Sequence, residues 1–164
     1  MEKSGSYAYM MKYCLLAGVV LIGFMNTAQG GEQKCLSEAI YFEARDQGWG
    51  GMLAVGVVVQ NRVAHRKYPD TICEVVKQGR YWNGNPVKWA CQFSYYCDGK
   101  PERPAEKESW ATAQEIAQLL LMRNIEIAGL EDVTHYHATW VTPSWSKVLE
   151  RRQQIGDHVF YVSR

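Results

Sequence analysis

The clearest apolar pattern in the chain lies in residues 36–45, LSEAIYFEAR, and it has helical spacing. Leu36, Ala39, Ile40 and position 43 are separated by three and four residues, so they share one face of a helix. A helix turns such a face towards its core, yet the last member here is a carboxylate, Glu43. Glu38 lies about 140° around the helix from Glu43, and we expect it to be solvated on a different face.

A carboxylate at the end of an apolar stripe is a candidate general acid. Burial at the edge of a core removes hydration that the charged form needs, which raises the pKa. Glu43 could therefore keep a proton near neutral pH and deliver it to a leaving group. The alternative is a structural carboxylate that pairs with Arg45 or with backbone N–H groups, and the helix alone leaves both open.

The hydrophobic pattern predicts more helices and one long loop. Residues 46–51 contain three glycines and interrupt the first helix. Residues 52–63 are apolar almost all round, and their length favours a buried helix over a buried strand. A short helix is predicted over residues 72–76 and a longer one over residues 104–123. Residues 78–104 lack periodicity, and we predict a long irregular loop of functional importance.

The C-terminal part alternates as strands do. Residues 134–139 predict a strand with its two histidines on one side and Tyr136 on the other. Residues 153–162 predict two strands around a Gly-Asp turn. Helices followed by short strands indicate an α+β fold, with a helical body and a small antiparallel sheet.

The N-terminal residues 1–30 have the pattern of an export signal. Lys3 and Lys12 precede an apolar run, and residues 28–30, AQG, form a small-x-small cleavage pattern. The run is short for a spanning helix, which needs about 20 apolar residues, but a retained membrane anchor over residues 13–28 stays an alternative. Residues 31–164 then form one domain. We expect it in the periplasm or the cell envelope, with any membrane contact made through residues 13–28.

The net charge of this domain argues against nucleic acid as a partner. The chain carries a net charge of +1, and Lys3 and Lys12 against Glu2 account for it, so residues 31–164 are neutral overall. That balance offers no basic surface for nucleic acid. We expect a monomer.

Four cysteines follow the predicted signal. An even number in an exported chain indicates two disulfides, for which three pairings exist. Closeness in sequence favours a local bridge between Cys91 and Cys97, which leaves Cys35 with Cys73. A zinc site is the alternative, but the chain has neither CxxC nor HExxH spacing.

Six segments, in this order, resemble the cell-wall hydrolase family typified by the spore-cortex-lytic enzymes SleB and CwlJ: residues 35–45, 54–63, 68–76, 91–99, 134–145 and 155–161. The resemblance implies a lysozyme-like or lytic-transglycosylase-like fold that acts on the glycan strands of peptidoglycan. It also implies that Glu43 is the catalytic acid. Family members often read EARGE where this chain reads EARDQ, so Gln47 stands in place of a second glutamate.

A lytic transglycosylase needs one carboxylate, whereas ordinary glycosidases use two. Glu43 would protonate the glycosidic oxygen and then accept the proton of the muramic acid C6 hydroxyl as that hydroxyl closes a 1,6-anhydro ring. This reaction requires no metal and no cofactor. The predicted sugar-binding residues, which could instead serve loop packing or the sheet, are Gln92, Phe93, Ser94, Tyr136 and His137.

Three alternatives remain open. Asp46 could be a second carboxylate for muramidase-type hydrolysis, and His135 with His137 could bind zinc in an amidase that cuts the peptide stems. The third is a non-catalytic peptidoglycan-binding module, although a binder gains nothing from an apolar-flanked acid such as Glu43. Its sugar-binding surface would be built from tryptophans: Trp49, Trp82, Trp89, Trp140 and Trp145.

Overall fold

The computed structural model describes residues 29–123 and 125–163. The chain divides into two units, and the fold described here is that of Glu32–Arg164. All but the last two residues of the predicted export segment, 1–30, lie outside the described residues. Within the described ranges no helix is both long enough and apolar enough to cross a membrane.

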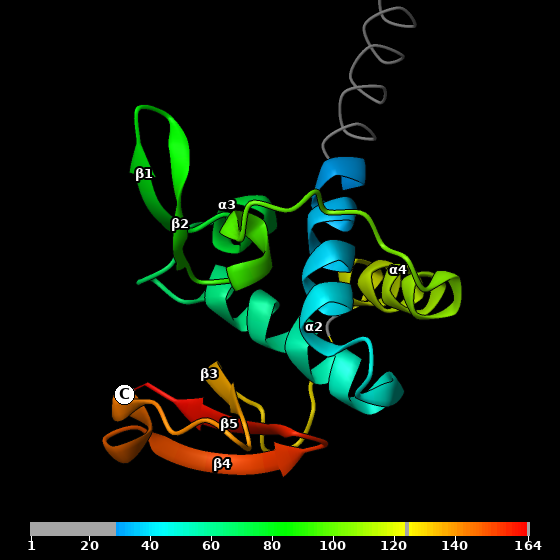
Figure 1. Cartoon of the computed structure of the whole chain (residues 1–164). Coiled ribbons are helices and arrows are strands. Elements are labelled where there is room, and N and C mark those ends of the chain that lie inside the picture. The colour runs from blue at the N-terminus through cyan, green and yellow to red at the C-terminus, as the bar shows by residue number, and fades with distance from the viewer. Residues whose placement is uncertain (1–28, 124, 164) are drawn as a thin grey trace, which may run out of the picture. The chain divides into compact units, whose positions relative to one another are not determined.

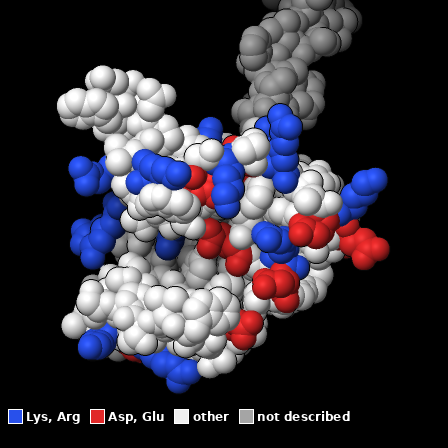
Figure 2. Space-filling view, in the orientation of Figure 1, with Lys and Arg blue, Asp and Glu red and all other residues white. Residues whose placement is uncertain are grey.

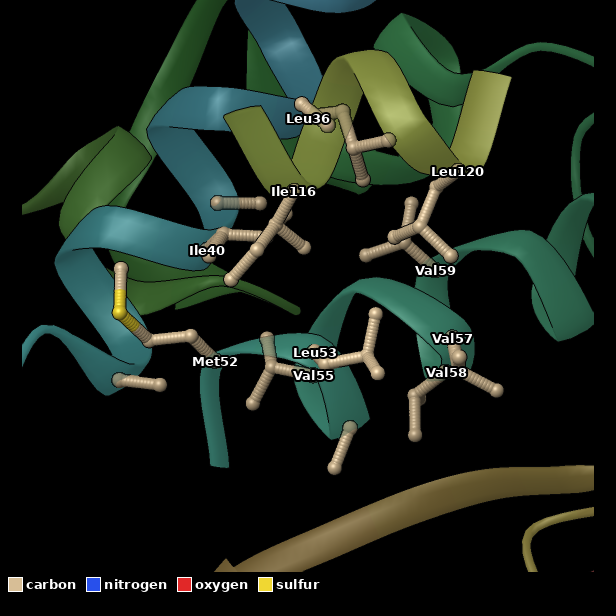
Figure 3. Close-up of a cluster of buried hydrophobic side chains, with 14 of the residues drawn as sticks. Leu36, Ile40, Met52, Leu53, Val55, Val57, Val58, Val59, Ile116 and Leu120 are labelled. Atoms are coloured by element: carbon tan, nitrogen blue, oxygen red, sulfur yellow. The ribbon is translucent and has the colours of Figure 1, made fainter. Parts of the chain in front are cut away.

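Three helices enclose the main hydrophobic core (Figure 1). They are the helix that ends at residue 44, named here the Glu43 helix, of which residues 29–44 are described, together with α2 (Gly48–Ala64) and α4 (Lys107–Met122). Figure 3 shows apolar side chains from all three helices converging on one cluster, and these side chains exclude water almost completely. Burial of such groups is the main stabilising contribution to the fold.

The helix predictions are confirmed, with shifted ends. The helix predicted over residues 52–63 begins earlier, at Gly48, so the glycine-rich segment interrupts the chain only at residues 45–47. The short helix α3 (Ile72–Val76) is capped by Thr71, whose Oγ1 accepts a hydrogen bond from the Glu74 N–H at 3.2 Å. The last helix, α4, begins three residues later than predicted.

A three-stranded antiparallel sheet follows the helices, as predicted, and completes the α+β fold. Its strands are β3 (Val133–Ala138), β4 (Glu150–Ile155) and β5 (His158–Val162), in the order β3-β5-β4. The central strand β5 is buried along its whole length. Strand β3 is an edge strand and packs beside α2, so its free edge is available to line a site.

The prediction of a long irregular loop is wrong over residues 79–91, which form a β-hairpin. Strands β1 (Gly79–Trp82) and β2 (Asn85–Cys91) pair around an Asn83-Gly84 turn with φ values of +48° and +78°. Asn-Gly is the strongest short hairpin signal, because both turn positions need positive φ. The strands lack apolar alternation because the hairpin buries neither face. A short 3-10 helix, η1 (Ser94–Cys97), follows.

Two disulfides secure the segments around the core. Cys35 and Cys73 join the Glu43 helix to α3, with their Cα atoms 5.2 Å apart. Cys91 and Cys97 close the segment after β2 at a Cα separation of 6.1 Å. This is the pairing that closeness in sequence favours.

Candidate active site

A cleft of about 340 Å³ lies between the helical body and the edge strand β3. Figure 2 shows the surface hollowed between the helical part and the sheet. The Glu43 helix, α2, the residue after β2, strands β3 and β5, and the segment between β3 and β4 all contribute side chains to it. The cleft is lined by Glu43, Arg62, Gln92, His135, Tyr136, His137, Ala138, Pro143, Trp145 and His158.

Glu43 is the one carboxylate among these lining residues. It follows Leu36, Ala39 and Ile40 on one helical face, and those three side chains are fully buried. The Tyr136 hydroxyl donates a hydrogen bond to Glu43 Oε2 at 3.1 Å. Burial raises the pKa of Glu43, while the Tyr136 hydrogen bond and the positive charge of Arg62 oppose the rise. The alternative partner Arg45 lies instead 3.5 Å from Glu106 Oε2.

Arg62 is a site residue that the sequence pattern does not predict. Its side chain is only 5% exposed, and its Nε donates to the Thr134 carbonyl at 2.8 Å. The guanidinium carbon lies 5.1 Å from the centroid of the Phe93 ring, a cation–π contact. Among the described residues its buried Nη1 has no hydrogen-bond partner, so Arg62 brings a positive charge with an unused donor to the cleft lining. The available signal was an arginine at the end of an apolar helix.

Side chains alternate between the two sides of β3, and Tyr136 lies on the side from which its hydroxyl reaches Glu43. It pairs with Phe160 across the β3–β5 ladder and packs against that ring and the ring of His158. Burial, with the nearby negative charge of Glu43, raises the pKa of Tyr136 well above its ordinary value. The phenol therefore stays protonated and acts as a hydrogen-bond donor to the carboxylate.

The two histidines of β3 lie on the other side of the strand, and both rings contact the Trp145 ring. Its ring centroid is 5.3 Å from that of His135 and 5.6 Å from that of His137. The His137 Nδ1 is 2.9 Å from the Ala138 carbonyl and its Nε2 is 3.0 Å from the Tyr161 hydroxyl. Because a carbonyl only accepts, Nδ1 donates to Ala138, and Nε2 shares a hydrogen bond with the Tyr161 hydroxyl.

Both ring nitrogens of His137 thus form hydrogen bonds within the domain. Across residues 29–123 and 125–163, no three His, Cys, Asp or Glu side chains are grouped as a metal site. Zinc binding would require His137 to lose one of its two hydrogen bonds, which weakens the amidase alternative.

The structure separates the three residues predicted on the loop after β2. Gln92 is exposed and lines the cleft. Phe93 is 1% exposed and packs in the core against Arg62. Ser94 lies in a different pocket, with Phe42 and Arg45. Of these three residues, only Gln92 is placed to touch a ligand in the cleft.

The other acidic residues near the first helix do not line the cleft. The expectation that Glu38 is solvated is wrong: its side chain is 18% exposed, lies 3.8 Å from Lys34, and has a pKa raised by burial. Asp46 is exposed, and its Oδ1 accepts a hydrogen bond from Gln47 Nε2 at 3.0 Å. Asp46 is therefore not positioned as a second carboxylate across the cleft.

Gln47 connects the helical body to the sheet. Its Oε1 accepts from the Asp157 N–H at 2.7 Å, and its Nε2 donates to Asp157 Oδ2 at 3.2 Å. A glutamate could not make the second of these bonds because an ionised carboxylate has no donor. Gln47, one of the two residues that depart from the EARGE pattern, thus holds the β4–β5 turn.

Comparisons with known proteins agree with this fold. The family model described as Cell Wall Hydrolase matches residues 46–161, starting just after Glu43. The catalytic domain of the germination-specific lytic transglycosylase SleB from Bacillus anthracis superposes with a TM-score of 0.61 at 21% identity, over 79% of this chain and 93% of that one. The catalytic domain of the Bacillus cereus SleB protein gives 0.55 at 19% identity, over 79% and 88%.

Comparison with curated proteins gives no match. At these identities the two SleB structures show a shared fold, while the family model covers most of the domain. The chain therefore belongs to the cell wall hydrolase family, an enzyme family that acts on peptidoglycan outside the cytoplasm.

Proposed function

We propose that this protein cleaves the glycan strands of peptidoglycan as a lytic transglycosylase and that Glu43 is its catalytic acid and base. The observation that carries the proposal is the lining of the cleft, in which Glu43 is the one carboxylate. Hydrolysis by two carboxylates needs a second acidic residue across the scissile bond. Asp46, the candidate from the sequence, lies outside the cleft. The similar Bacillus anthracis protein bears the description of a lytic transglycosylase.

The reaction requires two proton transfers at the same carboxyl group. Protonated Glu43 gives its proton to the glycosidic oxygen as the bond from that oxygen to C1 of muramic acid breaks. The C6 hydroxyl of the same sugar then attacks C1, and the Glu43 carboxylate takes the hydroxyl proton. A 1,6-anhydro ring forms, the carboxyl is restored, and no water is consumed.

The surroundings of Glu43 suit both halves of this cycle. Burial raises its pKa and favours the acid form that starts the reaction. Once the proton has left, the Tyr136 hydroxyl and the charge of Arg62 stabilise the carboxylate. An acid without these two partners would be harder to ionise, and an acid without burial would be ionised before substrate arrives.

Substrate contacts follow from the rest of the lining. Gln92 brings amide donors and acceptors from the helical side, and Trp145 brings an aromatic wall from the sheet side. We assign sugar binding to these two residues, with Tyr136 and His137 forming the floor beside them. Phe93 acts indirectly, by holding Arg62.

The place of action is also a proposal. Residues 1–30 would export the domain to the periplasm or cell envelope, with cleavage after Gly30 or retention as an anchor over residues 13–28. N-terminal sequencing of the exported protein separates these two fates, since a start at Gly31 shows cleavage and an intact Met1 shows retention.

Glu43→Gln tests the role of the acid. The amide keeps the shape and removes the titrating proton, so we expect glycan cleavage to fall at least about a hundredfold. Glu38→Gln is the matched control, because Glu38 is on the same helix outside the cleft. Release of soluble fragments from purified peptidoglycan measures both, with circular dichroism to show that each variant is folded. Near-parental cleavage by folded Glu43→Gln would refute the proposal.

A further inference from the structure

Two indole rings on the β1–β2 hairpin remain in solvent. Trp82 is 75% exposed and Trp89 is 64% exposed, values that place them among the most exposed large apolar side chains described. Figure 1 shows the hairpin projecting from the helical body. Two exposed indoles on one short element exceed the isolated apolar side chains that are normal on a surface, and they mark the hairpin as a candidate binding surface.

The backbone at Trp89 is unfavourable for a residue of its size. Its φ is +62°, in the left-handed region that bulky side chains rarely adopt, and it lies where the β1–β2 register shifts. Its ring gains no burial in return; its described neighbour is Lys88, whose Nζ is 5.3 Å from the ring centroid. Strained residues of this kind concentrate at ligand-binding sites.

The base of the hairpin is firmly held. A Cβ on Gly79 would lie 2.9 Å from both the Cys91 Cα and the Ala90 carbonyl oxygen, so only glycine allows this close approach. The Gln92 N–H donates to the Gln78 carbonyl at 2.9 Å, and the disulfide fixes Cys91. The base of the hairpin, two residues from Trp89, is therefore firmly held, while Trp82 lies at the other end beside the turn.

The hairpin is continuous with the Glu43 cleft. Strand β2 ends at Cys91, and the next residue, Gln92, lines the cleft. Trp89 is three residues before Gln92, so its backbone lies within about 10 Å of the cleft lining. A polymer that leaves the cleft on this side meets the hairpin.

The charge of the hairpin defines the ligand further. Residues 79–91 contain Arg80 and Lys88 and neither Asp nor Glu. The surface thus combines flat apolar rings with positive charge. Peptidoglycan offers both complements, because its pyranose rings have apolar C–H faces and its peptide stems carry carboxylates.

We propose that the hairpin is a second peptidoglycan-binding site, in which Trp82 and Trp89 stack against sugar rings of the strand outside the cleft and Arg80 and Lys88 pair with stem carboxylates. The site rests on the proposed function, since it holds the same polymer that Glu43 cuts. It would keep the enzyme on long insoluble strands between cuts.

Binding is measured in the Glu43→Gln background, so that cleavage does not interfere. In sedimentation with purified insoluble peptidoglycan, adding Trp82→Ala and Trp89→Ala should weaken binding at least about tenfold. Replacing both by Phe should restore most of the affinity. Trp49→Ala, which removes another exposed indole outside the cleft and hairpin, should change it less than about twofold. Unchanged binding by the double Ala variant would overturn the proposal.

Two further measurements exclude other roles. Trp89→Gly relieves the positive φ, so the proposal predicts an equal or higher melting temperature together with weaker binding, whereas a marked drop in melting temperature would assign Trp89 a structural role and overturn it. Flotation with phosphatidylglycerol vesicles tests whether the hairpin binds a lipid surface instead. If the double Ala variant loses vesicle binding but retains peptidoglycan binding, the proposal is also overturned. If Trp-dependent binding holds but the parental enzyme releases no glycan, the proposed cleavage fails and this site stands.

Discussion

At Glu43 two opposing influences act on one carboxyl group. Burial raises its pKa above the ordinary value of 4.5, and Tyr136 and Arg62 pull it back. A folded-state pKa above the unfolded one contributes stability that is fully present below the unfolded pKa and is lost as pH rises through the folded pKa. The fold therefore gives up some stability at neutral pH by burying a carboxyl group in the cleft.

Tyr136→Phe should move the pH dependence of cleavage in a defined direction. The hydroxyl stabilises the charged form of Glu43, so its loss raises the Glu43 pKa, and the basic limb of the rate profile should shift upward by about one pH unit. Rates of glycan release across the pH range measure the shift. Tyr161→Phe is the control, since its hydroxyl bonds His137 rather than Glu43. A basic limb that stays in place or moves down would contradict the assigned hydrogen bond.

Some residues of the site can be predicted from the sequence and others cannot. Glu43 can be predicted because a carboxylate on an apolar stripe breaks a local pattern. Its partner Tyr136 is 93 residues away, and strand periodicity shows only which side of β3 it faces. Arg62 was missed because its function depends on a carbonyl and a ring that the fold brings to it.

At the scale of elements, the Gln47 contact holds the sheet to the start of α2. The amide oxygen and the amide nitrogen of the Gln47 side chain both form hydrogen bonds with Asp157 in the β4–β5 turn. The sheet carries Tyr136, so this contact also maintains the wall that faces Glu43.

Gln47→Glu should weaken this contact. The change removes the Nε2 donor and places a second negative charge beside Asp157, so the free energy of unfolding should fall by about 1 kcal/mol. Adding Asp157→Asn removes the repulsion and supplies a donor, and it should recover most of the loss. Urea denaturation of the parent, the single and the double variants measures the coupling. If the single variant matches the parent, Gln47 does not hold the turn.

The helices and the C-terminal strands could be predicted from local signals: helical spacing for the Glu43 helix and α4, length and apolar composition for α2, and alternation or β-branched and aromatic residues for the strands. Residues 79–91 could not, since a hairpin exposed on both faces lacks alternation and its only local signal is Asn83-Gly84. The 3-10 helix η1 was hidden for a related reason, because a disulfide rather than a periodic face fixes Cys97.

For the whole molecule, the two disulfides should contribute unequally to stability. Cys35 and Cys73 are 38 residues apart, whereas Cys91 and Cys97 are 6 apart. Cross-linking a longer loop removes more entropy from the unfolded chain, about 4 kcal/mol against about 2 kcal/mol. Urea denaturation of the paired Cys→Ser variants measures each contribution. An equal or larger loss for the 91–97 pair would show that loop entropy does not dominate.

The cleft itself is a property of the whole molecule. It exists because α2 packs beside β3, which brings Arg62 to Thr134 across 72 residues. Family resemblance anticipated the shared fold, and the match over residues 46–161 confirms the family. Which side chains meet in the cleft follows only from that packing.

Mass spectrometry of the fragments released from purified peptidoglycan tests the central claim most directly. In a mechanism with one carboxylate the C6 hydroxyl is the nucleophile, so the released fragments should have 1,6-anhydro muramic acid ends. Each such end is lighter than a hydrolytic end by one water. Glu43→Gln should release almost no fragments. Reducing muramic acid ends would show hydrolysis, and freed peptide stems with intact glycan would show an amidase. Either product as the main species would contradict the lytic transglycosylase mechanism.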